Sequence, residues 1–320
     1  MRPVIPGDTD YDALYPLFDA FASTAAVTAA DELGIFDRLR LDRADAAALA
    51  RDCAISERGA TVLLTALAGI GLVESAGDGS YGVTPFQSQL MRLRDYYGPL
   101  AAAIRHDRPI VAADTPQHAH SFYPDVVPII ADLFAPAAER AAEHLAVPRL
   151  RVLDVGAGAA PWSLALARKC SDCWVTAVDL PAVLDVTRRS VAEDDRASQF
   201  TFLAGDVFSA DLGGPYDLAI AGNLCHLFDE AANQRLLARL YHALCPGGKI
   251  AIVDILVQEG LDGPRDAALY ALGLFLRTSA GRIYPFSTYA SWLRNAGFHG
   301  IERVDLPGKP RPGLITARRP

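Results

Sequence analysis

The sequence predicts an α/β fold: an open, mostly parallel, doubly wound sheet in the second half of the chain, preceded by a mostly α-helical domain. Three observations predict this. Residues 150–166 read as a buried strand, a glycine turn and the start of a helix. From residue 150 onward, short apolar strands alternate with helical patterns. Before residue 96, apolar residues recur mainly at helical spacing.

The N-terminal domain, residues 1–95, reads as helices followed by a β-hairpin. Ser56 is a suitable N-cap for one of the helices, with Glu57 in its first turn. The expected segments are 10–30, 45–51, 56–70 and the hairpin 72–84. Helix, turn, helix and hairpin in this order predict a winged helix.

A winged helix raises the possibility of a DNA-binding regulator. Residues 1–95 contain 8 Arg, no Lys and 14 Asp or Glu, so 8 − 14 = −6. Affinity for duplex DNA depends on neutralising phosphates, and this domain would repel them. We therefore expect it to pack against protein, as a dimerisation domain does, and DNA binding is the weaker alternative.

Residues 96–147 are expected to form a helical connector that lines the substrate pocket. The proline-punctuated stretch 109–128 predicts a loop, and a helix is expected at 129–145. His106, His118 and His120 lie in this region. We interpret them as polar loop histidines, because a metal site would need a further ligand that the sequence does not identify.

The catalytic domain is expected at 148–320 and begins with the strand 150–155. Its carboxylate, Asp154, stands two residues before a turn that contains Gly156 and Gly158, and Pro161 opens a helix. This is the nucleotide-binding corner of a doubly wound sheet. Proline replaces the third glycine of a dinucleotide fingerprint, and Asp154 would repel a pyrophosphate. The pattern thus favours a ligand with a cationic, phosphate-free end, such as S-adenosylmethionine (SAM).

The remaining strands alternate with helices, as in an open parallel sheet. They are expected at 174–179, 200–204, 217–221 and 249–255, and two last strands at 301–305 and 314–317. We expect the last two to form a C-terminal antiparallel hairpin that closes the sheet.

Acidic residues follow three successive strands. Asp179 ends the second strand, where a carboxylate accepts hydrogen bonds from ribose hydroxyls. Asp206 follows the third strand, where it would accept from an adenine amino group, with Val207 and Phe208 beside the ring. Together with Asp154 they favour SAM over NAD, since a dehydrogenase does not need the third acid. An NAD-dependent oxidoreductase remains an alternative.

His226 follows the fourth strand at its carboxyl end, where open α/β sheets bind their ligands. A lone histidine in an apolar stretch is usually structural, but this place favours a catalytic role. Methyl transfer from a sulfonium is an in-line displacement, and an imidazole can take the proton of an attacking hydroxyl.

Composition bounds the remaining possibilities. The chain has 320 residues, 51% of them hydrophobic, and a formal net charge of −8. Its N-terminus lacks a signal-peptide core, and its longest uncharged run, 59–73, is shorter than the roughly 18 residues that cross a bilayer. We expect a cytoplasmic protein without nucleic-acid or membrane partners. Five cysteines do not suit a disulfide framework, and the CxxC of Cys170 and Cys173 lacks a second pair for zinc, so no metal is expected.

Several short motifs together carry a resemblance to a known family. They are Ser56-Glu57-Arg58, Asp154-Val155-Gly156-Ala157-Gly158, Val178-Asp179-Leu180-Pro181, Gly205-Asp206-Val207-Phe208, Cys225-His226, Pro246-Gly247-Gly248-Lys249 and Trp292–Phe298. On these the chain resembles the class I SAM-dependent small-molecule O-methyltransferases, which include caffeic acid and acetylserotonin O-methyltransferases and bacterial natural-product tailoring enzymes.

The resemblance implies a Rossmann-like methyltransferase sheet, a winged-helix dimerisation domain, a homodimer and a metal-independent methyl transfer to a hydroxyl of a small aromatic substrate. It implies His226 as general base. The cofactor residues that it implies for SAM are Asp154, Gly156, Gly158, Asp179, Leu180, Asp206, Val207 and Asn223. Its candidates for the walls of the substrate pocket are Ile130, Phe134, Leu272 and Phe275.

The chain departs from the family pattern around the histidine. Relatives have His-Asp-Trp where this chain has His226-Leu227-Phe228, and residues 282–286 lack a glutamate that often orients the histidine. Asp254 and Asp266 remain as possible partners. Methylation of an activated carbon, or SAM binding without methyl transfer to oxygen, therefore stays open.

Overall fold

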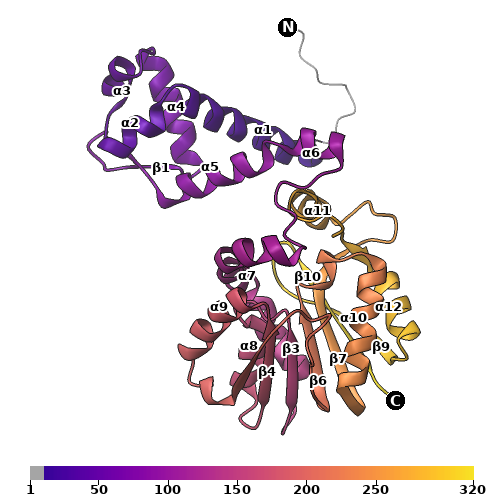
Figure 1. Ribbon diagram of the computed structural model, residues 1–320. Helices are drawn as coiled ribbons and strands as arrows, with labels where there is room; N and C mark the ends of the chain where they lie inside the picture. Colours follow the sequence, from indigo (N-terminus) through magenta and orange to yellow (C-terminus); the bar gives the residue numbers. More distant parts are fainter. Residues whose placement is uncertain (1–10) are drawn as a thin grey trace. The chain divides into compact units, whose positions relative to one another are not determined.

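The structure is a computed structural model that describes residues 11–320. The chain divides into two compact units between Gly98 and Pro99 (Figure 1). The connector expected at 96–147 does not form a unit of its own, because from Pro99 onward it belongs to the larger unit. Its helices pack on the helices of the sheet, which explains why the boundary falls before it.

The smaller unit consists of helices and one two-stranded antiparallel ribbon. Its elements are α1 (Tyr11–Glu32), α2 (Ile35–Leu41), α3 (Ala46–Asp52), α4 (Glu57–Gly69), β1 (Val73–Ser75), β2 (Tyr81–Val83) and α5 (Pro85–Tyr97). Ser56 caps α4 as expected, accepting a hydrogen bond from the Gly59 amide at 3.0 Å. Phe36, Leu49 and Leu64 are almost fully buried in its core. The expected elements occur in the expected order, with two further helices, α2 and α5, that the sequence analysis did not predict. The assignment as a winged helix stays a prediction.

The larger unit is an α/β domain built on one sheet. Its strands are β3 (Arg151–Val155), β4 (Trp174–Asp179), β5 (Phe200–Ala204), β6 (Tyr216–Gly222), β7 (Leu244–Val257), β8 (Tyr284–Pro285), β9 (His299–Asp305) and β10 (Pro312–Arg318). Its helices are α6 (Leu100–His106), α7 (Pro116–Leu145), α8 (Pro161–Lys169), α9 (Pro181–Ala192), η1 (Ala197–Gln199), η2 (Cys225–Leu227), α10 (Glu230–Ala243), α11 (Arg265–Arg277) and α12 (Phe286–Asn295).

The strand order in the described sheet is β5-β4-β3-β6-β7-β10-β9, with β8 paired to β7. Strands β3 to β7 run parallel, and β10 lies antiparallel between β7 and β9. The predicted C-terminal antiparallel pair is therefore present. The order reverses between β3 and β6, and a ligand binds at such a switch point, beyond the carboxyl ends of the strands.

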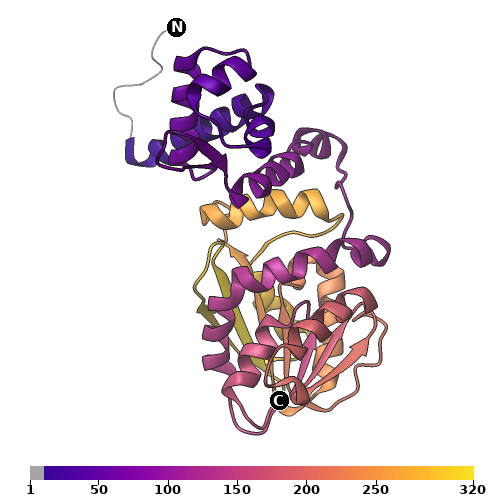
Figure 2. The ribbon, with the colours of Figure 1, turned by 90° about the vertical axis from the view of Figure 1, so that its left-hand side faces the viewer.

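Helices cover both faces of the sheet (Figure 1). The helices α7, α8 and α9 pack on one another and lie on the face turned toward the viewer in Figure 2. The helices α10 and α12 cover the other face. Six consecutive residues of α8, Trp162–Ala167, are buried, because α7 packs over the side that would otherwise meet solvent.

Two predictions about the connector, the start of its long helix and the loop position of its histidines, are wrong. Helix α7 begins at Pro116 rather than near residue 129, so the second part of the expected loop 109–128 is helical, and α6 precedes it. His118 and His120 consequently lie on α7 and His106 ends α6, so these are not loop histidines. Three prolines lie inside α7. Each removes one backbone hydrogen bond, and packing of this long helix on α8 and α9 offsets the loss.

Among the described residues, none of the helices combines the length and apolar character that a membrane span requires.

Candidate active site

The glycine turn after β3 places backbone amides at the carboxyl edge of the sheet. Gly156 and Gly158 have φ angles of +64° and +58°, which suit glycine. A Cβ on Gly156 would lie 2.8 Å from the side chain of Leu224, so the turn also needs the missing side chain for close packing. Ala160 also adopts a positive φ, +59°, directly before α8.

A cavity of about 360 Å³ lies over this turn, formed entirely by residues of the larger unit. Seven of the eight predicted cofactor residues line it: Gly156, Gly158, Asp179, Leu180, Asp206, Val207 and Asn223. The segment before α7, α7 itself and the loop after α11 provide other walls, including Asp114, Tyr123, Ile130 and Ala280. The cavity joins the ends of four strands, β3, β4, β5 and β6, to the helical connector.

Asp179 stabilises the glycine turn through hydrogen bonds and lines the cavity. One of its carboxylate oxygens accepts from the Gly158 amide at 2.8 Å, and the other accepts from the Leu180 amide at 2.7 Å. Burial raises the pKa of Asp179 to about 6, against the lowering effect of these two bonds. Each carboxylate oxygen has a second lone pair, so Asp179 can still accept from a ligand hydroxyl.

Asp154 is not among the described residues that line the cavity, contrary to the expectation that it faces the ligand. It is 1% exposed, and it accepts a hydrogen bond from the Ser163 hydroxyl at 2.5 Å. Burial raises its pKa to about 7. The hydrogen bond between Ser163 and Asp154 thus links β3 to the first turn of α8, and it stabilises the glycine turn from the protein interior.

Three cavity residues keep buried polar atoms without a hydrogen-bond partner. They are Asn223, with both amide atoms, Tyr123, with its hydroxyl, and Asp114, with one carboxylate oxygen. Buried polar atoms normally have partners, so these atoms point to a polar ligand. Sequence reasoning missed Tyr123 and Asp114, because it placed both in a loop and no motif marks them.

Asp206 and two aromatic rings, those of Phe208 and Phe228, form another part of the cavity wall. Asp206 accepts from the Phe208 amide at 2.9 Å, and the rings of Phe208 and Phe228 lie edge to face at 4.9 Å. An acidic acceptor beside aromatic rings suits a purine with an amino group. Volume, glycine cradle and unpartnered polar atoms together fit a nucleoside with a polar tail, as SAM is.

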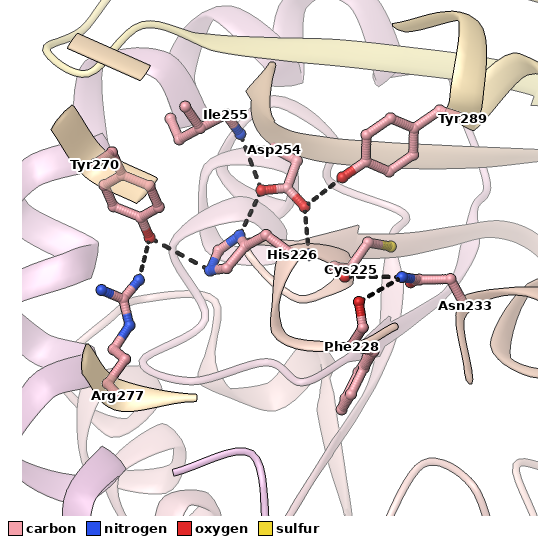
Figure 3. A network of polar contacts seen from close by, with 9 residues as sticks. All are labelled: Cys225, His226, Phe228, Asn233, Asp254, Ile255, Tyr270, Arg277 and Tyr289. Atoms are coloured by element: carbon pink, nitrogen blue, oxygen red, sulfur yellow. Dashed lines mark hydrogen bonds and ion pairs between the residues drawn. The ribbon is translucent and has the colours of Figure 1, made fainter. Parts of the chain in front are cut away.

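His226 lies on η2, directly after β6, and its side chain is fixed by Asp254 of β7 (Figure 3). Its Nδ1 is 2.5 Å from one Asp254 oxygen, and its backbone amide donates to the other at 3.0 Å. The Tyr289 hydroxyl and the Ile255 amide also donate to this carboxylate, both at 2.9 Å. Four donors therefore surround a carboxylate that is fully buried.

Of the two acids that the sequence kept open, Asp254 is the partner of His226. Asp266 accepts from the backbone amides of Ala267 and Arg311 instead. Figure 3 shows the other imidazole nitrogen, Nε2, facing Tyr270 of α11, whose hydroxyl lies 3.3 Å away. Arg277 donates to the same hydroxyl at 2.6 Å.

The predicted pocket walls separate into two groups. Ile130 lines the cavity, whereas Phe134, Leu272 and Phe275 are not among its described lining residues. Phe134 is 2% exposed and packs against Trp162, with ring centroids 6.2 Å apart, so it belongs to the core between α7 and α8. No group of side chains in residues 11–320 has the composition of a metal site, and Cys170 and Cys173 are buried free thiols.

Comparisons with known proteins identify the family of the chain. A profile of the O-methyltransferase domain matches residues 137–299, and one of the O-methyltransferase dimerisation domain matches residues 15–92. The 3-hydroxy-5-methyl-1-naphthoate 3-O-methyltransferase of Streptomyces sahachiroi is 29% identical over 318 residues, which cover 92% of this chain and 91% of that protein. The acetylserotonin O-methyltransferase of Rattus norvegicus is 28% identical over 341 residues, 98% of this chain and 78% of that protein.

Among solved structures, human N-acetylserotonin methyltransferase in complex with SAM has the same fold, with a TM-score of 0.68 and 22% identity over 98% of this chain and 99% of that chain. The domain profile covers half of the chain and includes the cavity's strand ends and His226. The chain therefore belongs to the O-methyltransferase family and is a SAM-dependent methyltransferase.

Proposed function

We propose that the chain methylates a hydroxyl of a small aromatic acceptor, with His226 as the general base. The observation that carries this proposal is the buried pair of His226 and Asp254, 2.5 Å apart at the carboxyl end of β6. The acceptors in the names of the relatives, a hydroxynaphthoate and acetylserotonin, support an aromatic acceptor. The family assignment supports neither the NAD-dependent oxidoreductase nor the DNA-binding regulator.

The cavity residues divide the binding of SAM among them. Asp206 would accept from the adenine amino group, with Val207 beside the ring. Asp179 would accept from the ribose hydroxyls, next to Leu180. The amide group of Asn223 and the turn around Gly156 and Gly158 would hold the polar tail. Of these residues, Asn223 supports its assignment with two buried amide atoms that have no hydrogen-bond partner in the described part of the chain.

The chain's own chemistry is the removal of one proton. When bound, SAM supplies a methyl group on a positively charged sulfur. A neutral hydroxyl is a weak nucleophile, so His226 takes its proton as the oxygen attacks. Asp254 holds the Nδ1 proton and stabilises the imidazolium that forms, which leaves Nε2 as the basic nitrogen. General-base catalysis of this kind contributes ~10²–10⁴-fold, and positioning supplies the remainder.

We also propose that the chain is a homodimer joined through its N-terminal domain. Five large apolar side chains on the first turns of α1 are exposed, from 41% for Leu14 to 79% for Phe21. They are Leu14, Tyr15, Leu17, Phe18 and Phe21. A contiguous apolar surface of this kind marks a protein interface, and the match to a dimerisation domain supports a second copy as its occupant.

Methyl-labelled SAM tests the reaction directly. The protein is incubated with a panel of phenols, and mass spectrometry locates the label in the product. We expect the label on oxygen. Label on a ring or α-keto carbon would make the chain a C-methyltransferase, and tight SAM binding without any labelled product would contradict methyl transfer to this class of acceptor.

Replacing the base tests its role. We expect His226→Ala to retain its affinity for SAM, because His226 does not line the cavity, and to slow turnover by at least ~10²-fold. Calorimetric titration measures the affinity and the labelled product measures the turnover. Unchanged turnover would make His226 a structural residue.

A further inference from the structure

The basic nitrogen of His226 faces a tyrosine. The imidazole side chain is 3% exposed, and His226 is not among the described residues that line the cavity. Its Nε2 lies 3.3 Å from the hydroxyl of Tyr270, and the two rings are nearly perpendicular, at 87°. In this arrangement the tyrosine hydroxyl occupies the position beside Nε2 that an acceptor hydroxyl would need.

The direction of each hydrogen bond in this chain of groups follows from the chemistry of its members. A guanidinium can only donate, so the Tyr270 oxygen accepts from Arg277 at 2.6 Å. His226 uses its Nδ1 proton toward Asp254. The remaining proton, on the Tyr270 hydroxyl, therefore points to Nε2 (Figure 3). The groups form one continuous proton path from Tyr270 to His226.

The helix that carries Tyr270 and Arg277 is joined to the wall of the cavity. Both lie on α11, seven positions apart and hence on one face of the helix. Tyr123, which lines the cavity, has its pKa raised by burial, and the charge of Arg277 lowers it while Tyr270 raises it. The end of α11 is tied to the cavity wall, since the Ile110 and Ala113 amides donate to its carbonyls at 2.7 Å and 2.6 Å. Helix α11 therefore adjoins the cavity wall, and Tyr270, like His226, is not among the described residues that line the cavity.

We propose that Tyr270 is a catalytic proton relay between the acceptor hydroxyl and His226. The acceptor O–H bond breaks and its proton forms a new O–H bond with Tyr270, while the original proton of Tyr270 leaves its oxygen and bonds to Nε2 of His226. The acceptor oxygen keeps the electron pair with which it attacks the methyl group. The proton ends on the imidazolium, paired with Asp254. This relay rests on the proposed function, in which His226 is the final base.

Arg277 suits the relay because the oxygen of Tyr270 gains negative character while both protons are in transit. The guanidinium donates a charge-assisted hydrogen bond to that oxygen and lies 5.0 Å from the ring centroid. It thereby stabilises the phenol at the moment when its own proton has left. A phenol held only by neutral donors would lack this stabilisation.

The test compares acceptors that need a base with acceptors that do not. Wild type, Tyr270→Phe, His226→Gln and Tyr216→Phe are assayed with catechol and with 4-nitrocatechol, at a pH between the two phenol pKa values. Tyr216→Phe is the matched control, since its hydroxyl also donates one buried bond, to the Leu212 carbonyl at 2.8 Å, but lies outside the network. Calorimetric titration with SAM, and the 15N resonance of the His226 Nε2, are recorded for each variant.

We expect Tyr270→Phe to slow transfer to catechol by ~10²-fold or more and to slow transfer to the ionised nitrocatechol by less than about threefold. His226→Gln should show the same contrast, and Tyr216→Phe should slow neither acceptor. The Nε2 resonance should shift in Tyr270→Phe and stay in place in Tyr216→Phe, whether or not either catechol is turned over, and SAM affinity should be unchanged.

Each other result overturns a defined part of the proposal. If His226→Gln shows the contrast and Tyr270→Phe equals or exceeds wild type, the acceptor reaches Nε2 directly and the relay is wrong, while the proposed function stands. If Tyr270→Phe slows both acceptors equally, the tyrosine is structural. An unshifted Nε2 resonance removes the contact on which the relay depends. If His226→Gln slows neither acceptor, the proposed base falls as well.

Discussion

Asp154 and Asp179 end neighbouring parallel strands, yet they have different tasks. Asp179 lines the cavity and holds the amides of Gly158 and Leu180. Asp154 lies beneath the turn, bonded to Ser163. In the register of β3 and β4, Asp154 pairs with Ala177, so Asp179 lies two positions nearer the carboxyl edge, and this difference decides which carboxylate meets the ligand. Burial raises the pKa of both carboxyl groups. Because only Asp179 lines the cavity, only its raised pKa can make ligand affinity depend on pH.

The affinity for SAM should depend on pH through Asp179. In the free protein burial raises its pKa to about 6, so below that pH the carboxyl is largely protonated. A cationic ligand with ribose donors favours the carboxylate, and binding therefore releases a proton. Affinity should be full above the free-protein pKa and fall by up to about tenfold per pH unit below it. Calorimetric titration between pH 5 and 8 measures this.

Two variants identify the group responsible for the pH dependence. Asp179→Asn should bind SAM more weakly than wild type above the pKa and should show little change with pH. Asp154→Asn should keep the wild-type dependence, because Asp154 does not line the cavity. A midpoint near 7 that disappears in Asp154→Asn would instead assign the proton to Asp154, whose pKa is about 7.

At the scale of elements, the last residue of β6 packs closely against the first turn of α8. Gly222 ends β6, and a Cβ there would lie 2.2 Å from two atoms of the Trp162 ring. Trp162 lines the cavity and is 5% exposed, so its ring has little room to move. Gly222 does not adopt a left-handed backbone conformation. The close approach of the Trp162 ring, and not the backbone angle, therefore requires glycine at this position.

We expect Gly222→Ala to destabilise the larger unit by about 1–3 kcal/mol, the usual cost of overpacking a filled core, and to weaken SAM binding because the ring moves into the cavity. Differential scanning calorimetry and titration with SAM measure the two effects. The matched control is Gly69→Ala, where nothing lies within 4 Å of the added Cβ. Equal behaviour of the two variants would contradict the packing argument.

Helix α7 shows why the ends of an element are difficult to predict from the sequence. Its prolines at 124 and 128 indicate a loop, but the structure continues the helix through them. Contacts with α8 and α9, both distant in sequence, stabilise the helix despite the lost hydrogen bonds. As a result Tyr123 comes to line the cavity, where no sequence motif would have placed it.

For the whole molecule, the proposed dimer predicts that the exposed apolar surface of α1 sets the state of assembly. We expect the double variant Phe18→Asp and Phe21→Asp to be monomeric, because two charges would be buried without partners in the interface. Sedimentation velocity measures the mass. Leu261→Asp, at a loop position that is 66% exposed in the larger unit, is the matched control and should remain a dimer. A wild type that is monomeric at micromolar concentration would contradict the proposed dimer.

The sequence by itself determined the parallel sheet, its C-terminal antiparallel pair, the glycine turn and the strand-end positions of Asp179, Asp206 and His226. Strand periodicity, turn residues and the place of a residue at a strand end are local signals, and the hydrophobic pattern of a doubly wound sheet leaves few alternative arrangements.

Only the tertiary structure decided which acid holds His226, which hydroxyl covers its basic nitrogen and which polar atoms of α7 face the cavity. Asp254 and Tyr270 lie 28 and 44 residues from His226 along the chain. Contacts over such separations depend on sheet register and helix packing, which are set by the burial of many side chains at once. Local residue patterns do not encode such contacts, so only the packing of the strands and α11 shows that His226 contacts Asp254 and Tyr270.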